Sequence, residues 1–176
     1  LFYFNFPRNF VPQEIIDRYK PYLNRIPGNI IFEPIDFINY SVQGVNLPGV
    51  AFDPVAQIGK IGTTRSYRSS IHATETRSKE FTVTMQLLDG YINYWMMFDI
   101  FDYYYRTDVK DVHMPDGTVV RILDSEGNII VSTEMKNVLF KEISALDMLF
   151  ANNAPDFSTF ECTFEYNILE TKIELS

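Results

Sequence analysis

The fold is decided by two stretches, FSTFECTFEYNIL at residues 157–169 and KEFTVTMQLL at residues 79–88. Both alternate apolar and polar side chains, and a β-strand turns successive side chains to opposite faces. Antiparallel sheets with one face on the core and the other in water show this pattern. We therefore predict two strands, whose polar faces comprise Glu80, Thr82, Thr84, Gln86, Thr159, Glu161, Thr163, Glu165 and Asn167.

These polar faces carry no Lys or Arg between Glu80 and Gln86 or between Thr159 and Asn167. Threonine and glutamate make a hydrated, acidic surface, which is more typical of a wall in contact with water than of a catalytic cleft. The whole chain is acidic as well, with a formal net charge of −8. Because an acidic surface repels phosphate, we expect no tight binding of nucleic acid, although DNA could pass close by without being held.

The composition favours one domain, or one domain with an extended arm, since 176 residues with 46% hydrophobic content can bury a single core. The one cysteine, Cys162, falls on the apolar side of its predicted strand and is expected to be a small buried residue. A single cysteine excludes a disulfide framework. No apolar run is long enough to cross a bilayer, so we predict no membrane segment.

The remaining pattern predicts a β-rich α+β domain with six or seven strands and two helices. Further strands are expected at 35–45, 118–123, 129–133 and 138–144, with a hairpin turn at 125–128. A short helix is expected over 12–26, where Pro21 should kink or divide it. A second helix over 91–105, capped by Asp89, is apolar on nearly all sides, so we expect it to be buried against a sheet, with a partner as a further option.

The N-terminal segment is unusually aromatic and shows no helical spacing. Its aromatic residues are Phe2, Tyr3, Phe4, Phe6 and Phe10. A free monomer would not usually leave such residues in water, so the segment either packs on its own domain or docks on a neighbour. We assign these five residues to a contact between subunits, and expect that removal of residues 1–10 leaves a folded monomer.

Residues 51–78 form a long arm with little hydrophobic periodicity. Loops of this length in compact domains are usually functional or disordered, and the β-branched residues here would allow an extended hairpin. The arm is basic whereas the C-terminal region is acidic, which would suit a contact between copies. We predict that Arg65, Tyr67 and Arg68 reach an adjacent subunit, because aromatic residues and Arg dominate such contacts.

The sequence offers little chemistry. The only histidines are His72 and His113, and His113 lies between Asp111 and Asp116. Such a set could hold a metal, but a solvated loop is the interpretation that we adopt. The sequence contains no phosphate-binding loop, dinucleotide fingerprint, zinc-protease helix or nucleophile elbow. We therefore predict no catalytic residues, no metal and no cofactor.

The order of motifs points to a known family. A strand ends in Leu47-Pro48-Gly49, and the arm leads to FTVTMQLLDGYINYWMMFDIF at 81–101. MKNVLFKEISALDMLF at 135–150 and FSTFECTFEYNILE at 157–170 complete the pattern. Over about residues 35–169 the chain resembles the tail tube proteins of contractile-tailed bacteriophages. The resemblance implies a small antiparallel β-sandwich or partial barrel with one flanking helix. It also implies stacked rings of six copies whose lumen conducts DNA and is lined by the nine polar residues above.

The resemblance sets further expectations. Residues 1–34 are treated as an N-terminal extension and 35–176 as the tail-tube-like domain. The expected function is that of a structural subunit of a phage tail tube, assembled in the host cytoplasm into a virion that ejects its genome. The expected partners are other copies, the sheath, baseplate and tape-measure proteins, and DNA in the lumen. Alternatives are a tube initiator or terminal ring at the baseplate or neck, and an inner-tube subunit of a contractile injection or secretion system. The non-structural alternative is a small soluble binding domain, and an enzyme is disfavoured because no polar residues converge.

Overall fold

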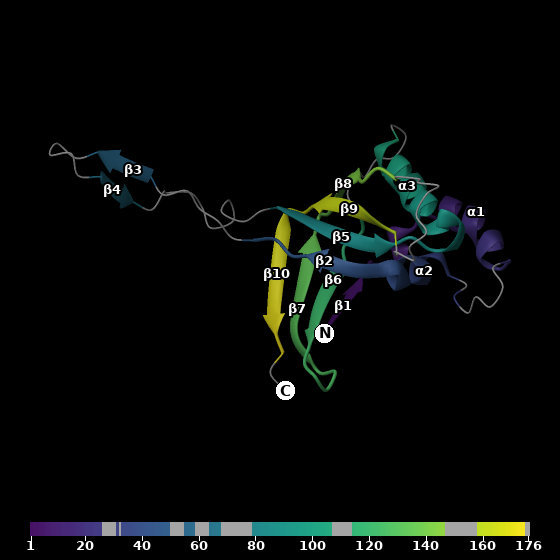
Figure 1. The fold of residues 1–176 in the computed structure, drawn as a ribbon, viewed down its shortest axis with the longest axis horizontal. Coiled ribbons are helices and arrows are strands. Elements are labelled where there is room, and N and C mark those ends of the chain that lie inside the picture. The colour runs from purple at the N-terminus through teal and green to yellow at the C-terminus, as the bar shows by residue number, and fades with distance from the viewer. Residues whose placement is uncertain are drawn as a thin grey trace.

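The computed structural model describes residues 1–25, 31, 33–49, 55–58, 64–67, 79–106, 114–146 and 158–174. Within these residues the chain forms two four-stranded antiparallel sheets, a two-stranded hairpin and three α-helices (Figure 1). The predicted class, a β-rich α+β fold with antiparallel sheets, is confirmed. Neither sheet closes into a barrel over the described part of the chain.

Sheet A has the strand order β1 (Phe2–Asn5), β6 (Thr118–Leu123), β7 (Ile129–Lys136) and β10 (Ile168–Ile173). Sheet B has the order β2 (Val42–Asn46), β5 (Glu80–Gln86), β9 (Thr159–Glu165) and β8 (Leu139–Ile143). The hairpin joins β3 (Val55–Ile58) to β4 (Thr64–Tyr67) and stands apart from both sheets in Figure 1. The β-branched residues of the arm were expected to allow an extended hairpin or arm; β3 and β4 pair as a hairpin, and the rest of the arm lies outside the described residues.

The stretch at 157–169 was predicted as one strand, and this is wrong because the chain changes sheets within it. β9 ends at Glu165 in sheet B and β10 begins at Ile168 in sheet A. At the corner, the backbone N–H of Tyr166 donates to Lys79 O at 2.8 Å and that of Asn167 to Lys136 O at 3.2 Å. Both sheets therefore hold the corner, and the side chains change phase there, since Tyr166 is buried whereas Ile168 is 45% exposed.

The strand predicted at 35–45 is mostly a helix. α2 runs from Pro34 to Ser41 and is followed directly by β2. Pro34 occupies the first turn, where its missing N–H is harmless. The buried residues Pro34, Phe37, Ile38 and Ser41 recur at helical spacing. The sequence thus contained both periods over this stretch, and packing against the core selects the helical one.

The two predicted helices are present with altered ends. α1 (Gln13–Leu23) is not divided at Pro21, which lies two residues before its end, so the missing N–H costs at most one hydrogen bond. α3 (Ile92–Tyr105) is preceded by the 3₁₀ turn η3 (Asp89–Tyr91), and its N-cap is Tyr91 rather than Asp89. Including α2, three helices gather on one side of the sheets in Figure 1, so the expected single flanking helix was an underestimate.

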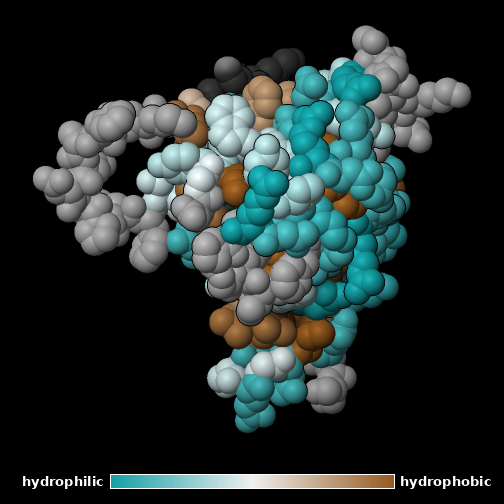
Figure 2. Space-filling view, turned by 90° about the vertical axis from the view of Figure 1, so that its right-hand side faces the viewer, coloured by the Kyte–Doolittle hydropathy of each residue, from teal (hydrophilic) through white to brown (hydrophobic). Residues whose placement is uncertain are grey.

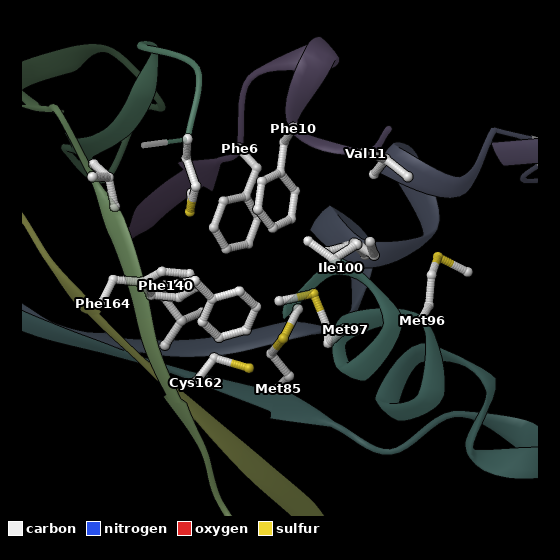
Figure 3. Packing of buried hydrophobic residues seen from close by; sticks show 14 of the residues in the cluster. Phe6, Phe10, Val11, Met85, Met96, Met97, Ile100, Phe140, Cys162 and Phe164 are labelled. Carbon is white, nitrogen blue, oxygen red and sulfur yellow. The ribbon is translucent and has the colours of Figure 1, made fainter. Parts of the chain in front are cut away.

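The core contains the N-terminal segment that was expected to contact a neighbour. Phe4, Phe6 and Phe10 are buried, and Phe6 stacks on Phe10 with ring centroids 4.4 Å apart (Figure 3). Phe6 also contacts Phe164 of β9, with ring centroids 5.5 Å apart. The assignment to a subunit contact is therefore wrong for Phe4, Phe6 and Phe10, because their own domain already covers them. Removal of residues 1–10 would open this core, so the expected folded monomer is corrected too.

Other parts of the same prediction stay open. Phe2 and Tyr3 are exposed on β1 and remain candidates for a contact between subunits. The backbone of Arg65 and Tyr67 lies in β4, whereas Arg68 lies outside the described residues. The division at residues 34 and 35 also remains a prediction. Residues from both sides of it, such as Ile15 and Phe81, belong to one hydrophobic cluster.

Candidate functional site

The polar residues predicted from two strands lie together on the outer face of sheet B. β5 and β9 are adjacent and antiparallel, which places Thr82 opposite Thr163 and Thr84 opposite Glu161. The hydroxyl oxygens of Thr82 and Thr163 are 3.5 Å apart. On the other face, the apolar residues of both strands are buried; they are Phe81, Val83, Met85, Phe160, Cys162 and Phe164. Sheet B therefore separates a dry core from a hydrated surface.

Asn167 does not share this surface. It lies at the corner between β9 and β10, beyond the last residue of sheet B in this segment. The prediction included it because the alternation continues past Glu165, although the strand does not.

The edge strands of sheet B widen the polar surface. In β2, the side-chain amide of Gln43 donates to Gln86 Oε1 at 3.1 Å, and Asn46 lies opposite Thr82. In β8, Glu142 lies opposite Thr163. The resulting surface, which we call the polar wall, comprises Gln43, Asn46, Glu80, Thr82, Thr84, Gln86, Lys141, Glu142, Thr159, Glu161, Thr163 and Glu165. The sequence pattern predicted the polar residues of the two central strands, but not those that the edge strands β2 and β8 add to this surface.

The polar wall contains one cation that the sequence analysis did not place there. Lys141 lies at a bulge in β8, between Phe140 and Glu142, and forms an ion pair with Glu80. The hydrogen bond to Glu80 raises the pKa of Lys141, and the charges of Glu80, Glu165 and Glu142 act in the same direction. Lys141 is thus held among carboxylates. The wall remains acidic, with four glutamates and one lysine, a net charge of −3.

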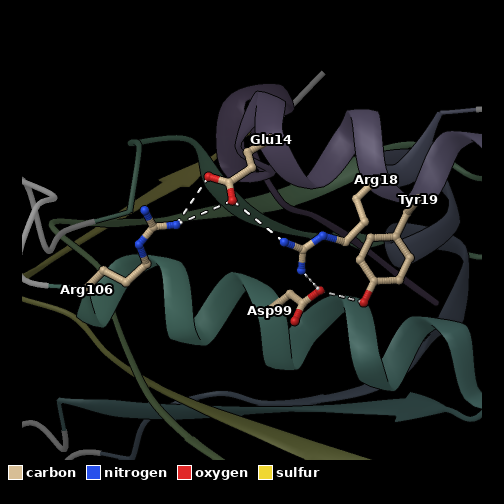
Figure 4. A network of polar contacts seen from close by, with 5 residues as sticks. All are labelled: Glu14, Arg18, Tyr19, Asp99 and Arg106. Atoms are coloured by element: carbon tan, nitrogen blue, oxygen red, sulfur yellow. Dashed lines mark hydrogen bonds and ion pairs between the residues drawn. The ribbon is translucent and has the colours of Figure 1, made fainter.

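A second polar cluster joins α1 to α3 (Figure 4). Asp99 Oδ2 accepts hydrogen bonds from Arg18 Nη1 and from the Tyr19 hydroxyl, both at 2.7 Å. Glu14 Oε2 lies 3.2 Å from Arg106 Nη1. Burial, and secondarily the hydrogen bond to Asp99, raises the pKa of Tyr19 above its usual range. These ion pairs are largely exposed and therefore individually weak, so the cluster is a polar contact between two helices.

In the described part of the chain, no group of three or more His, Cys, Asp and Glu side chains could hold a metal ion. His72 and His113 lie outside the described residues. Cys162 is buried, and burial raises the pKa of its thiol well above the usual value. No described helix has both the length and the apolar character that a bilayer crossing requires.

Comparisons with known proteins place the fold. No protein-family model and no curated protein matches the chain. The solved tube-terminating cap of the anti-feeding prophage is similar in structure, with a TM-score of 0.52 at 10% identity over 76% of this chain and 80% of that one. The sheath/tube terminator of an extracellular contractile injection system, PVC, in its extended state gives a TM-score of 0.51 at 10% identity, over 74% and 84%. At this identity the likeness shows the fold alone, and the expected tube-type fold is confirmed.

Proposed function

We propose that this protein is a structural subunit of the tube of a contractile tail or injection particle, and that copies of it assemble into a ring. The observation that carries the proposal is the polar wall, a broad acidic surface backed by a dry core across all four strands of sheet B. The fold shared with two tube-terminating proteins supports the same assignment.

The polar wall is suited to face the channel of such a ring. DNA carries one charge per roughly 1.7 Å of its axis, and proteins hold it through Lys and Arg. A wall of Thr, Gln and Glu offers phosphates no net attraction, and its one cation is already paired with Glu80. In a six-fold ring, as the sequence resemblance implies, a net charge of −3 per subunit becomes −18 around the channel. Such a channel would let DNA or another polyanion slide.

The finer form of the proposal is a phage tail tube. In that form stacked rings conduct DNA, a sheath surrounds them, and a baseplate and a tape-measure protein complete the tail. The exposed Phe2 and Tyr3, and the arm with Arg65, Tyr67 and Arg68, would contact adjacent copies.

A second position in the particle has its own support. The two solved structures of similar fold are both described as terminating a tube, one as a cap and one as a sheath/tube terminator. A terminal ring needs one surface that stacks on the tube and one that does not continue it. We therefore keep a tube-terminating ring as the alternative to the repeating tube subunit.

Electron microscopy of the purified protein over a range of concentrations tests the proposal. Tubes that lengthen with concentration support the repeating subunit, and discrete rings support the terminal position. A monomer at every concentration would refute both and would favour a small binding domain.

Cysteine labelling tests the orientation of the wall. Glu161→Cys places a thiol on the polar wall, and Glu134→Cys places one on the outer face of sheet A as the control. We expect a bulky maleimide to label both variants equally as monomers, and to label the Glu134 variant alone in assembled particles. Equal labelling after assembly would show that the wall does not face an enclosed channel. Cys162 contributes little background because it is buried.

A further inference from the structure

One end of the inner face of sheet A lacks the cover that most of that face has. Phe4, Val120 and Thr133 lie in one row across three strands and are buried. Two residues further along each strand, on the same face, the next row reads Phe2, Ile122, Val131 and Ile173. Phe2, Ile122 and Ile173 are 42%, 37% and 68% exposed. We call this row the apolar ledge.

The ledge lies at the end of the molecule that carries the N-terminus, the C-terminus and the β6–β7 hairpin (Figure 1). Figure 2 shows a band of hydrophobic residues in the lower part of the molecule, above a hydrophilic tip. The four residues of the apolar ledge lie on the four strands of sheet A, one on each, and none of them is charged. A face of this composition is dry elsewhere in the same sheet, so the ledge is a core surface with its second layer absent.

Helix α3 carries a second apolar surface that is not covered. Its inner side chains Met96, Met97 and Ile100 are fully buried, yet its outer side is also aromatic. Trp95 and Phe98 of α3 are 46% and 47% exposed, and Tyr91, just before the helix, is 41% exposed. Trp95 and Phe98 form an edge-to-face pair with ring centroids 6.1 Å apart. Exposed aromatic side chains gathered on one side of a helix are normally covered, so this group, which we call the aromatic seam, lacks a cover too.

We propose that the aromatic seam of one copy packs on the apolar ledge of the next copy. A helix on the apolar face of a sheet is a standard two-layer arrangement, and each patch supplies the layer that the other lacks. The two patches lie at different ends of the molecule in Figure 1, so the contact is head-to-tail and can close a ring. This inference rests on the proposed function, since it identifies the contact through which copies assemble.

The size of the patches favours a second copy over an unrelated partner. Stable protein interfaces use about 20–30 residues on each side, many more than the four of the ledge or the three of the seam. One such contact would not hold a separate protein in solution. In a closed ring every subunit is held at two places, so each contact forms at a high effective concentration. Ring closure also covers both patches at once, whereas a foreign partner on one would leave the other in water.

Cross-linking tests the geometry without removing either patch. Thr171→Cys borders the ledge, one row from Ile173, and Asp102→Cys borders the seam, one turn from Phe98. Both positions are exposed. With a short bis-maleimide, we expect a ladder of oligomers from the double variant. We expect dimers alone from an equal mixture of the two single variants, and monomers from either single variant by itself.

The other outcomes overturn the inference in distinguishable ways. Dimers from Thr171→Cys alone would mean that two ledges face each other, and dimers from Asp102→Cys alone that two seams do. Rings in the microscope without any cross-link would leave the proposed function intact and refute this contact. A ladder without rings would retain the contact and refute the proposed ring.

Charge substitution provides a second readout. We expect Ile173→Asp and Phe98→Asp to raise the concentration for half-assembly by about tenfold or more, because a carboxylate would be buried without a partner. Ile168→Asp is the matched control, since Ile168 is exposed on the opposite face of the same strand. All three monomers should retain the wild-type circular dichroism. Equal assembly of the Ile173 and Ile168 variants would contradict the proposal.

Discussion

The substitution Phe6→Ala tests whether the N-terminal segment belongs to the core. Phe6 has no exposed surface, and its ring lies 4.4 Å from Phe10, 4.7 Å from Phe4 and 5.5 Å from Phe164, between centroids. Truncating such a ring removes the transfer free energy and leaves a cavity, which together cost about 3–5 kcal/mol. Domains of this size have a stability of about 5–15 kcal/mol. We therefore expect a large loss of stability, which could approach complete unfolding in the least stable case.

The assay is urea unfolding of the monomer, followed by circular dichroism and by the fluorescence of Trp95, the only tryptophan. The matched control is Phe2→Ala, in the same strand, where the side chain is 42% exposed. For Phe2 we expect a loss below about 1 kcal/mol in the monomer. Equal losses for the two variants, or a loss below about 1 kcal/mol for Phe6→Ala, would refute the placement of this segment in the core.

Three further predictions concern the polar wall, the start of α3 and the buried thiol. Glu161→Lys with Glu165→Lys should change the stability of the monomer by less than about 1 kcal/mol, because both side chains lie on the hydrated face. Under the proposed function as a tube that conducts DNA, particles carrying both lysines should deliver DNA less efficiently, and unchanged delivery would contradict the channel assignment. Asn93→Ala should lower the free energy of unfolding in urea by about 1–3 kcal/mol, because two hydrogen bonds of a buried amide are lost. Asn93 Oδ1 accepts from Leu88 N at 3.1 Å, and Asn93 Nδ2 donates to Gln86 O at 2.7 Å. An unchanged free energy of unfolding would contradict this role. Burial keeps the pKa of Cys162 high and the thiol protonated, so a thiol reagent at pH 8 should react only after urea unfolding; rapid labelling of the native monomer would contradict this.

The local elements that the sequence predicts well are those stabilised by their own pattern. β5 and β6 lie where alternation places them, and the turn before β7 forms as expected. In that turn Gly127 has φ of 91°, and Asp124 N donates to Asn128 O at 3.0 Å. The polar and apolar faces of β5 and β9 were also predictable, because the period of a strand assigns each side chain to one face.

The sequence could not determine which strands and side chains pack against one another. Alternation in the sequence continues from β9 through Asn167 into β10, so it does not reveal that the chain leaves one sheet for the other. Lys141 reaches the polar wall only because a bulge adds a residue to β8. The aromatic N-terminus had to be covered by something, and composition does not say by what. The tertiary structure decides these points. The periodicity of the sequence indicates whether a side chain is buried, whereas long-range packing determines which residues bury it.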